Sequence, residues 1–218
     1  MTFRDRAAAG QHLAKLVEKY RPEHPLVLGL VRGGMAVAAE IAAALGAPLD
    51  VLVVRKVGVP GHPELAMGAV ASGIIWLNEP LIAELGVSRS EVDRAVAAES
   101  KEVERREALY REGRPALPVK ERTVIVVDDG LATGATAVAG LRVLRQGGAK
   151  RLVFAAPVCS HEGGRRVERE ADEFVCASRP PDFYAVSQAY DSFTQLSDAE
   201  VRHYLEAAAS GAAAGGGG

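Results

Sequence analysis

The chain has 218 residues, of which 48% are hydrophobic and 25% charged, and its formal net charge is −2. This composition suits one domain with a sizeable core, and it lacks the basic surplus expected of a nucleic-acid-binding protein. With two cysteines, no apolar leader and no apolar stretch near the roughly 20 residues of a spanning helix, we expect a cytoplasmic protein without a disulfide scaffold, a secretory signal or a membrane span.

Helical and strand patterns alternate along the first sixty residues. Apolar residues at helical spacing begin at Ala7 and end before Pro22, and a core strand is expected over 25–31. A glycine pair then leads into an alanine-rich helix over 35–45, and a second strand is expected over 50–57. This alternation predicts an α/β fold with a parallel sheet.

A segment rich in glycine and proline interrupts the alternation after residue 57. We expect a mobile lid loop over about 57–72 and a β-return in which 67–71 and 74–77 form the strands of a hairpin. A Ser-x-x-Glu capping box opens a densely charged helix over about 88–110. We interpret this helix as a solvent-facing or subunit-facing arm, which makes a homodimer a candidate assembly.

The second half of the chain repeats the strand–helix alternation. The expected elements are strands over 123–127, 151–158 and 173–177 and helices over 135–146 and 197–209. Because no segment is long enough to serve as an interdomain linker, we expect a single domain over 1–209, followed by a flexible tail over 210–218.

The most informative stretch runs from Thr123 to Thr136. A β-branched run ends in two adjacent carboxylates, Asp128 and Asp129, and small residues then open a helix. Open α/β sheets bind ligands at the carboxyl ends of their strands, and the free amides of a helix N-terminus favour an anion. Because ionised carboxylates accept hydrogen bonds from vicinal hydroxyls, the stretch predicts a site for a phosphorylated pentose. The residues expected around the phosphate are Ala132, Thr133, Gly134, Ala135 and Thr136.

Two other interpretations of this stretch compete with that prediction. A P-loop of the Walker type is disfavoured, because no lysine precedes the final threonine and the acids come first. A plain strand–turn–helix with an accidental pair of acids remains an alternative.

The stretch strongly resembles the fingerprint of type I phosphoribosyltransferases. The resemblance extends over roughly residues 2–206 and is closest to bacterial proteins described as predicted phosphoribosyltransferases.

The resemblance implies a parallel sheet with helices on both faces, a flexible lid loop and a small hood formed by about 1–6 and 179–196. It also implies that 5-phosphoribosyl-1-pyrophosphate (PRPP) is bound with Mg²⁺. Val31, Arg32 and Gly33 would form the pyrophosphate loop, often with a non-proline cis peptide, here near Val31–Arg32. The residue types agree with this role, since glycines allow close backbone approach to a diphosphate and Arg32 supplies a guanidinium fork.

Two further groups complete the predicted site. Arg55 and Lys56 stand at the root of the lid, where cations could neutralise charge on the leaving group. A cluster of side chains near the C-terminus could stack on or contact a planar acceptor, although core packing explains it nearly as well. Its members are Val175, Phe183, Tyr190 and Phe193.

Residue chemistry suggests a mechanism for this site. Displacement of pyrophosphate from ribose passes through an oxocarbenium-like state, which the fixed charges of Asp128 and Asp129 could stabilise. Mg²⁺ would be carried largely by the diphosphate, so no separate metal cage from the protein is expected. The predicted activity is transfer of 5-phosphoribosyl to an unidentified nitrogenous acceptor.

Two non-enzymatic functions compete with this prediction. A regulatory protein could use the same pocket to sense PRPP or a nucleotide without turnover. The presence of Arg32, Arg55 and Lys56 argues against it, because a sensor needs no leaving-group clamp. A nucleic-acid-binding attenuation protein would need a basic patch that the net charge does not favour.

Two departures from the family's pattern concern the acceptor. Enzymes acting on 6-oxopurines typically carry an acid before the Thr-Gly of the fingerprint and a lysine before the proline after the next strand. This chain has Ala132 and Ala156 at those places. The resemblance therefore implies that 6-oxopurines are poor acceptors.

Overall fold

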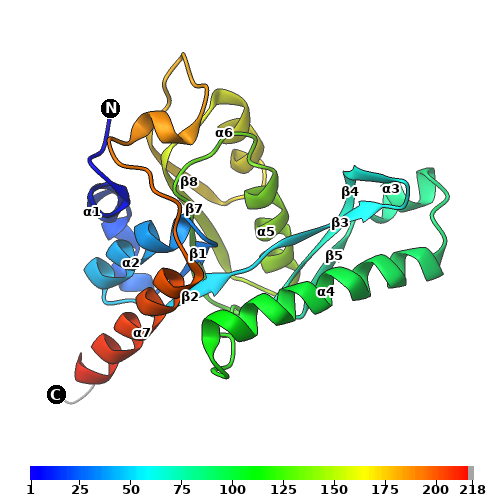
Figure 1. The fold of residues 1–218 in the computed structure, drawn as a ribbon, viewed down its shortest axis with the longest axis horizontal. Coiled ribbons are helices and arrows are strands. Elements are labelled where there is room, and N and C mark those ends of the chain that lie inside the picture. The colour runs from blue at the N-terminus through cyan, green and yellow to red at the C-terminus, as the bar shows by residue number, and fades with distance from the viewer. Residues whose placement is uncertain (216–218) are drawn as a thin grey trace.

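The computed structural model describes residues 1–215 (Figure 1). The helices are α1 (Arg6–Val17), α2 (Gly34–Leu45), α3 (Glu79–Glu84), α4 (Arg89–Arg111), α5 (Ala135–Gln146), α6 (His161–Glu168) and α7 (Asp198–Gly215), with short 3₁₀ turns at Glu18–Glu23 and Val186–Ala189. The strands are β1 (Leu26–Leu30), β2 (Leu49–Leu52), β3 (Arg55–Val59), β4 (His62–Ala71), β5 (Ile74–Leu77), β6 (Thr123–Val127), β7 (Arg151–Val158) and β8 (Glu173–Ser178).

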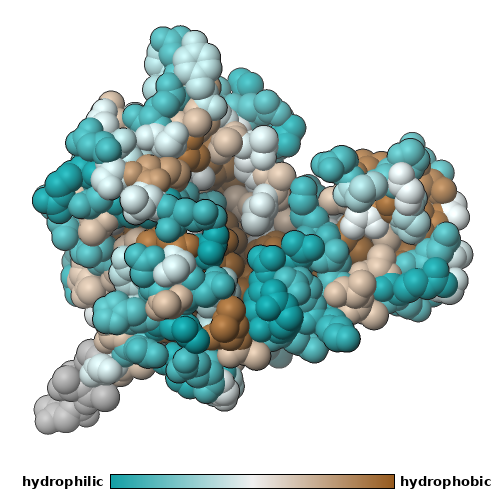
Figure 2. Space-filling view, viewed as in Figure 1, coloured by the Kyte–Doolittle hydropathy of each residue, from teal (hydrophilic) through white to brown (hydrophobic). Residues whose placement is uncertain are grey.

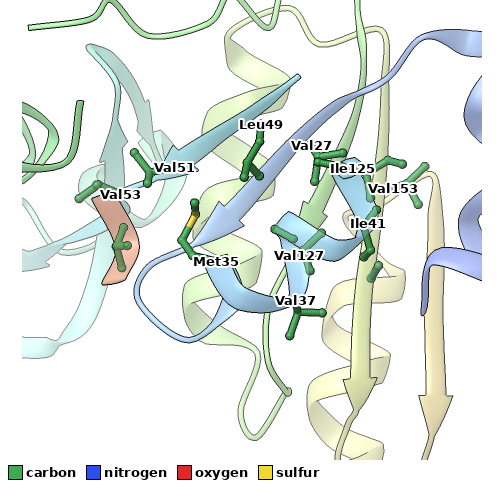
Figure 3. Packing of buried hydrophobic residues seen from close by; sticks show 14 of the residues in the cluster. Val27, Met35, Val37, Ile41, Leu49, Val51, Val53, Ile125, Val127 and Val153 are labelled. Carbon is green, nitrogen blue, oxygen red and sulfur yellow. The ribbon is translucent and has the colours of Figure 1, made fainter. Parts of the chain in front are cut away.

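The body of the molecule is a five-stranded parallel sheet in the order β2-β1-β6-β7-β8. Successive side chains on a strand point to opposite faces, so the continuous apolar runs of β1, β6 and β7 serve two cores. Val27, Ile125 and Val153 belong to the core under α1, α2 and α7 (Figure 3), whereas Val126 and Phe154 belong to the core under α5 and α6. This confirms the predicted α/β fold with helices on both faces.

The strand order reverses between β1 and β6. From β1 the chain crosses through α2 to β2 on one side, and it later returns to place β6 on the other side of β1. Gly29 pairs with Val127, so the loops that follow these two strands leave the sheet together. Ligands of open α/β sheets bind in the crevice at such a switch point.

A second unit projects from the body as an arm (Figure 1). It contains the antiparallel sheet β3-β4-β5, α3 and the long helix α4. The start of α4 has the predicted capping box, formed by Ser88 and Glu91. Its other end is held by a buried ion pair between Arg111 Nε and Asp50 Oδ1 (2.9 Å), and Leu117 N donates to the second oxygen of the same carboxylate (2.9 Å). Arm and body are therefore joined by a buried polar contact as well as by apolar packing.

The arm corrects the prediction for 50–72. The expected strand over 50–57 is two strands in different sheets, β2 and β3, and the expected lid loop over about 57–72 is largely the antiparallel pair β3 and β4. β3 and β4 pair despite the glycines and prolines because their register shifts on both sides of Gly58. A Cβ on Gly58 would lie 2.9 Å from Pro63 Cα. Gly61, at φ +80°, occupies the tight turn.

The C-terminal segment also differs from its prediction. Ser197 and Glu200 form the reciprocal hydrogen bonds of a capping box, so the final helix begins as expected. However, α7 continues to Gly215, beyond the end expected near Ala209, and the part of the predicted tail at 210–215 is helical. Residues 216–218 lie outside the described residues. Within 1–215, no helix has both the length and the apolar character needed to cross a membrane.

Candidate functional site

Two loops pack against each other at the switch point. A Cβ on Gly34 would lie 2.5 Å from the Val127 carbonyl oxygen, and a Cβ on Gly33 would lie 1.9 Å from Asp129 Oδ2. These are distances that no side chain tolerates, so the glycines after β1 allow the residues after β6 to approach closely. The Val31–Arg32 peptide bond is cis, as the family resemblance implied. The structure thus brings the predicted pyrophosphate loop and the paired carboxylates together.

The loop between β6 and α5 is supported by the end of β7 and the start of α6. Leu131 N donates to Val158 O (2.9 Å), and Leu131 O accepts from Ser160 N (2.8 Å). The Ser160 hydroxyl caps α6 and also donates to Ala132 O. Sequence reasoning did not single out Ser160, and its only signal was its place as an N-cap before a helix.

Residues 132–136 form the turn into α5. Gly134 is the N-cap in the left-handed region at φ 71°, and the helix begins at Ala135. The first amides of a helix have no acceptor within it, and the exposed side chains of Thr133 and Thr136 flank them here. A short turn of this kind can hold a phosphate between backbone amides and hydroxyls. The five predicted phosphate-binding residues therefore form one continuous turn, 132–136, which we call the phosphate turn.

Arg6 is the principal site residue that the sequence did not identify by itself. Its Nε lies 2.7 Å from Asp129 Oδ2, and the two side chains are only 9% and 14% exposed. The same guanidinium donates to Thr194 O (2.7 Å), and its carbon lies 3.9 Å from the centre of the Phe193 ring. Arg6 therefore neutralises one of the two carboxylates and ties the N-terminal segment to the site.

Removing this cation is expected to destabilise the fold strongly. Arg6→Ala leaves the Asp129 carboxylate buried without its partner, which typically lowers the free energy of unfolding by about 3–5 kcal/mol. Because Arg6 opposes the rise in the pKa of Asp129, the loss should shrink as acid protonates the stranded carboxylate. Urea denaturation at neutral and acidic pH measures both effects.

The matched control is Arg89→Ala. Arg89 and Asp93 form an ion pair on α4 with side chains 73% and 59% exposed, so the loss should stay below about 1 kcal/mol. Equal losses in the two variants would contradict the assignment of a buried, energetically coupled pair at Arg6.

Asp128 lies directly after β6, and one of its carboxylate oxygens accepts from Asp129 N (2.9 Å). Burial and the neighbouring Asp129 carboxylate raise the pKa of Asp128 well above its usual range. Burial also raises the pKa of Asp129, and the Arg6 guanidinium opposes that rise. A cation or a set of hydroxyl donors placed at this pair would favour the ionised forms.

The terminal segments expected to form a hood lie side by side next to Asp129. Phe3 N donates to Ala189 O (2.8 Å), and Asp191 N donates back to Phe3 O (2.8 Å). Tyr190 Oη donates to the backbone oxygen of Asp129 (2.6 Å), so this layer is bonded to the fingerprint itself. Its selection of an acceptor remains a prediction.

The predicted acceptor residues differ in their surroundings. The Tyr190 and Phe193 rings are stacked with centroids 5.0 Å apart, and Arg6 lies against Phe193. Phe183 packs against the same small cluster, whereas Val175 packs against the core under α1 and α2. The rings of Tyr190 and Phe193 thus already stack on each other, and Arg6 covers part of Phe193.

The predicted cations are not brought to one point. Arg32, in the loop after β1, lies 3.9 Å from Asp198 at the start of α7. Arg55 lies on β3, where its Nε is 2.7 Å from Glu99 Oε2 of α4. Adjacent strand residues face opposite ways, and Lys56 lines a cavity of about 370 Å³ that Ala135 of the phosphate turn also lines. Figure 2, seen from the same side as Figure 1, shows a hollow between body and arm. Lys56 therefore lines the cavity that Ala135 also borders, and Arg55 does not.

These features define a class: an α/β protein with a glycine-capped turn into a helix and paired carboxylates at the switch point of a parallel sheet. The phosphoribosyl transferase domain family matches residues 5–192. TT1426 of Thermus thermophilus, of known crystal structure, is 43% identical with a TM-score of 0.86, over 94% of this chain and 98% of that chain. The chain belongs to the phosphoribosyl transferase domain family.

Curated relatives extend beyond the matched region. The Mycobacterium tuberculosis protein named "Putative phosphoribosyl transferase Rv0571c" is 43% identical over 207 residues, which are 94% of this chain and 47% of that protein. Its counterpart in another strain of the same species matches equally. This chain therefore spans about half the length of the curated relatives it matches.

Proposed function

We propose that the protein is a Mg²⁺-dependent phosphoribosyltransferase, which moves 5-phosphoribosyl from PRPP to a nitrogenous acceptor and releases pyrophosphate. The observation that carries the proposal is the contact between Gly33 and Asp129, because it joins a diphosphate-type loop to paired carboxylates beside a phosphate-type turn. Family membership supports the same donor substrate. The cytoplasmic location and a homodimer built on the arm remain parts of this proposal.

Each part of PRPP has a suitable partner in the site. The turn 132–136 would bind the 5′-phosphate, and Asp128 with Asp129 would accept hydrogen bonds from the ribose hydroxyls. The backbone of 31–33 and the Arg32 guanidinium would bind the diphosphate. As the bond from C1 to the diphosphate breaks, positive charge grows on the ribose, and the adjacent carboxylates would stabilise it.

The carboxylate pair also suits Mg²⁺. Its donors are all oxygens, and burial together with the neighbouring Asp129 charge raises the pKa of Asp128, so a cation bound there would favour its ionised form. Within residues 1–215 there is no cluster of three or more His, Cys, Asp or Glu side chains able to hold a metal by itself. Asp128 would therefore share the ion with the diphosphate and water, and the ion would neutralise charge on the leaving group.

The two cations of the arm, Lys56 and Arg55, would act beside the diphosphate leaving group. Lys56 lines the cavity that reaches Ala135, so a modest movement of the arm would bring its ammonium toward bound phosphates. Arg55 could contribute only after leaving Glu99. Tyr190, Phe193, Phe183 and Val175 remain our candidates for the acceptor side. Hydrogen bonding by the backbone of 185–195 would supplement any stacking there.

Gly33→Ala is expected to damage the donor site. A methyl group would occupy the space of the Asp129 carboxylate, 1.9 Å from Oδ2, so the loop or the carboxylate must move. Overpacking of this kind lowers the free energy of unfolding by about 1–3 kcal/mol, and we expect PRPP affinity to fall at least about tenfold. Calorimetric titration with Mg²⁺-PRPP measures the affinity.

Gly140→Ala in α5 is the matched control, since its nearest contacts are side-chain methyl groups at 3.2 Å that can shift. It should retain PRPP binding. If Gly33→Ala binds PRPP as tightly as the unchanged protein, the contact between the two loops does not form the donor site.

Release of pyrophosphate from Mg²⁺-PRPP tests the activity itself. The protein is incubated with a panel of nucleobases and amines, and we expect release that depends on one class of acceptor and on Mg²⁺. A reaction without acceptor is the control for hydrolysis. Tight PRPP binding without release across a panel that includes adenine, orotate, nicotinate, ammonia and glutamine would favour the sensor interpretation. Absence of both binding and release would refute the proposal.

A further inference from the structure

The only two cysteines of the chain lie next to each other beside the site. Cys159 follows β7, Cys176 lies on the neighbouring strand β8, and their Sγ atoms are 3.1 Å apart. Both are free thiols. A disulfide requires the sulfur atoms to be about 2.05 Å apart, so an approach of about 1 Å would suffice. Closing this gap requires the residues that carry the two thiols to move toward each other.

The two thiols differ in access and in charge. Cys159 is fully buried, whereas Cys176 is partly exposed. A Cβ on Gly164 would lie 3.2 Å from Cys159 Sγ and 3.7 Å from Arg179 Cζ, so a guanidinium shares the small space around the thiols. The hydrogen bond with Cys159, together with Arg179, lowers the pKa of the Cys176 thiol, whereas that hydrogen bond and burial raise the pKa of Cys159.

We propose that Cys176 and Cys159 form an oxidative modification site, in which Cys176 is the thiol that a hydroperoxide oxidises to a sulfenic acid and Cys159 is the thiol that converts this sulfenic acid to a disulfide. The Cys176 thiolate attacks the terminal oxygen of the hydroperoxide, the O–O bond breaks, and the alcohol, or water, leaves. Cys159 sulfur then attacks the sulfenic sulfur: the S–S bond forms, the S–O bond breaks, and the hydroxide takes the Cys159 proton as water. Two thiols lose two electrons in total, and the peroxide gains them.

The position of Cys159 connects this modification to the phosphate turn. Cys159 forms an isolated parallel bridge with Leu131, and the next residue, Ser160, bonds to Leu131 O and Ala132 O. Pulling Cys159 toward β8 therefore displaces the support of the turn. Because this step rests on the proposed function, it predicts weaker binding of ribose 5-phosphate to the oxidised protein.

The chemistry is tested on the reduced full chain with hydrogen peroxide. Because the chain has no other cysteine, alkylation of remaining thiols and the intact mass report on this pair alone. We expect both thiols to disappear, the mass to fall by two hydrogen atoms, and dithiothreitol to restore both thiols. Cys159→Ser should instead accumulate a sulfenic acid at Cys176 that dimedone traps. Cys176→Ser should lose its remaining thiol at least about tenfold more slowly than the unchanged chain loses its thiols. Cys159→Ala, checked by circular dichroism, replaces the serine variant if that fails to fold.

Three outcomes overturn the modification site. These are thiols that survive excess peroxide, a disulfide that forms only between chains on a non-reducing gel, and a Cys176→Ser protein that reacts as fast as the unchanged chain. Ribose 5-phosphate titration separates the two claims. A disulfide without any change in affinity refutes the coupling alone, whereas no binding in either redox state refutes the proposed function and leaves the disulfide chemistry intact.

Discussion

Asp128→Asn is expected to lower kcat/KM for PRPP by about 10²-fold, the scale of losing one preorganised electrostatic contact. Asparagine keeps the size of the side chain but cannot carry the negative charge that would stabilise an oxocarbenium-like ribose. Steady-state pyrophosphate release measures the loss. Asp129→Asn should also reduce turnover, but it strands the buried Arg6 as well, so its effect mixes catalysis with stability.

The free energy of unfolding distinguishes a catalytic role of Asp128 from a structural one. Burial raises the pKa of Asp128 in the folded protein, so its contribution to stability is present below the unfolded carboxyl pKa and is lost as pH rises through the folded pKa. At neutral pH, above the unfolded carboxyl pKa, folding has to bury this charge or take up a proton, so Asp128→Asn should unfold no more easily than the unchanged protein. The variant should also lose that part of the pH dependence, which urea denaturation between acidic and neutral pH measures.

The control for Asp128→Asn is Asp93→Asn. Asp93 lies on the exposed face of α4 in an ion pair with Arg89, so turnover should not change. Full activity in the Asp128→Asn, Asp129→Asn double variant would show that the carboxylates are not the catalytic site. Inactivity that tracks unfolding would assign Asp128 a structural role instead.

Hypoxanthine, guanine and xanthine are expected to be poor acceptors, each with kcat/KM below about 10⁴ M⁻¹s⁻¹. Ala132 is an exposed residue of the phosphate turn, and Ala156 is fully buried in β7 against the core under α5. Neither side chain can hydrogen bond to the ring nitrogen or the exocyclic oxygen of a 6-oxopurine. Each missing partner is worth about 1–3 kcal/mol, or one to two orders of magnitude in discrimination. Adenine remains a candidate, because adenine-type enzymes also carry alanine before Thr-Gly.

Steady-state kinetics with the three oxopurines and adenine test this expectation. Ala132→Asp is the matched variant, since the exposed position can accept a carboxylate, and we expect it to raise oxopurine use by up to about tenfold relative to adenine. An oxopurine used efficiently by the unchanged protein would refute our interpretation of Ala132 and Ala156.

Much of the fold follows from local patterns in the sequence. The continuous β-branched runs of β1, β6 and β7 predict buried parallel strands, and the glycines and caps that follow them predict where helices begin. Once the parallel alternation is accepted, the residues after β1 and β6 must lie at the same edge of the sheet. Asp128, Asp129, the turn 132–136 and the loop 31–33 could therefore be assigned to one site from the sequence alone.

The arm shows where local patterns fail. Glycine and proline at 58–63 indicated a loop, yet β3 and β4 pair there, because tertiary pairing with register shifts outweighs weak strand propensity. The opposite orientation of Arg55 and Lys56 follows from that pairing and from Glu99 on α4. A cation's sequence position next to a predicted lid therefore did not determine which group it would face.

The sequence by itself determined the strands β1, β6, β7 and β8 of the main sheet. It also predicted the sheet edge of the candidate site and the residues of the phosphate turn, because each depends on periodicity and spacing within a short window. Only the tertiary structure decided that Arg6 neutralises Asp129, 123 positions away, and that Cys159 lies against Cys176 beneath the turn. Such contacts join residues through packing between elements, and no local pattern specifies the partner. The charge state of the carboxylate pair depends on burial and on Arg6, and so it too emerged only from the folded chain.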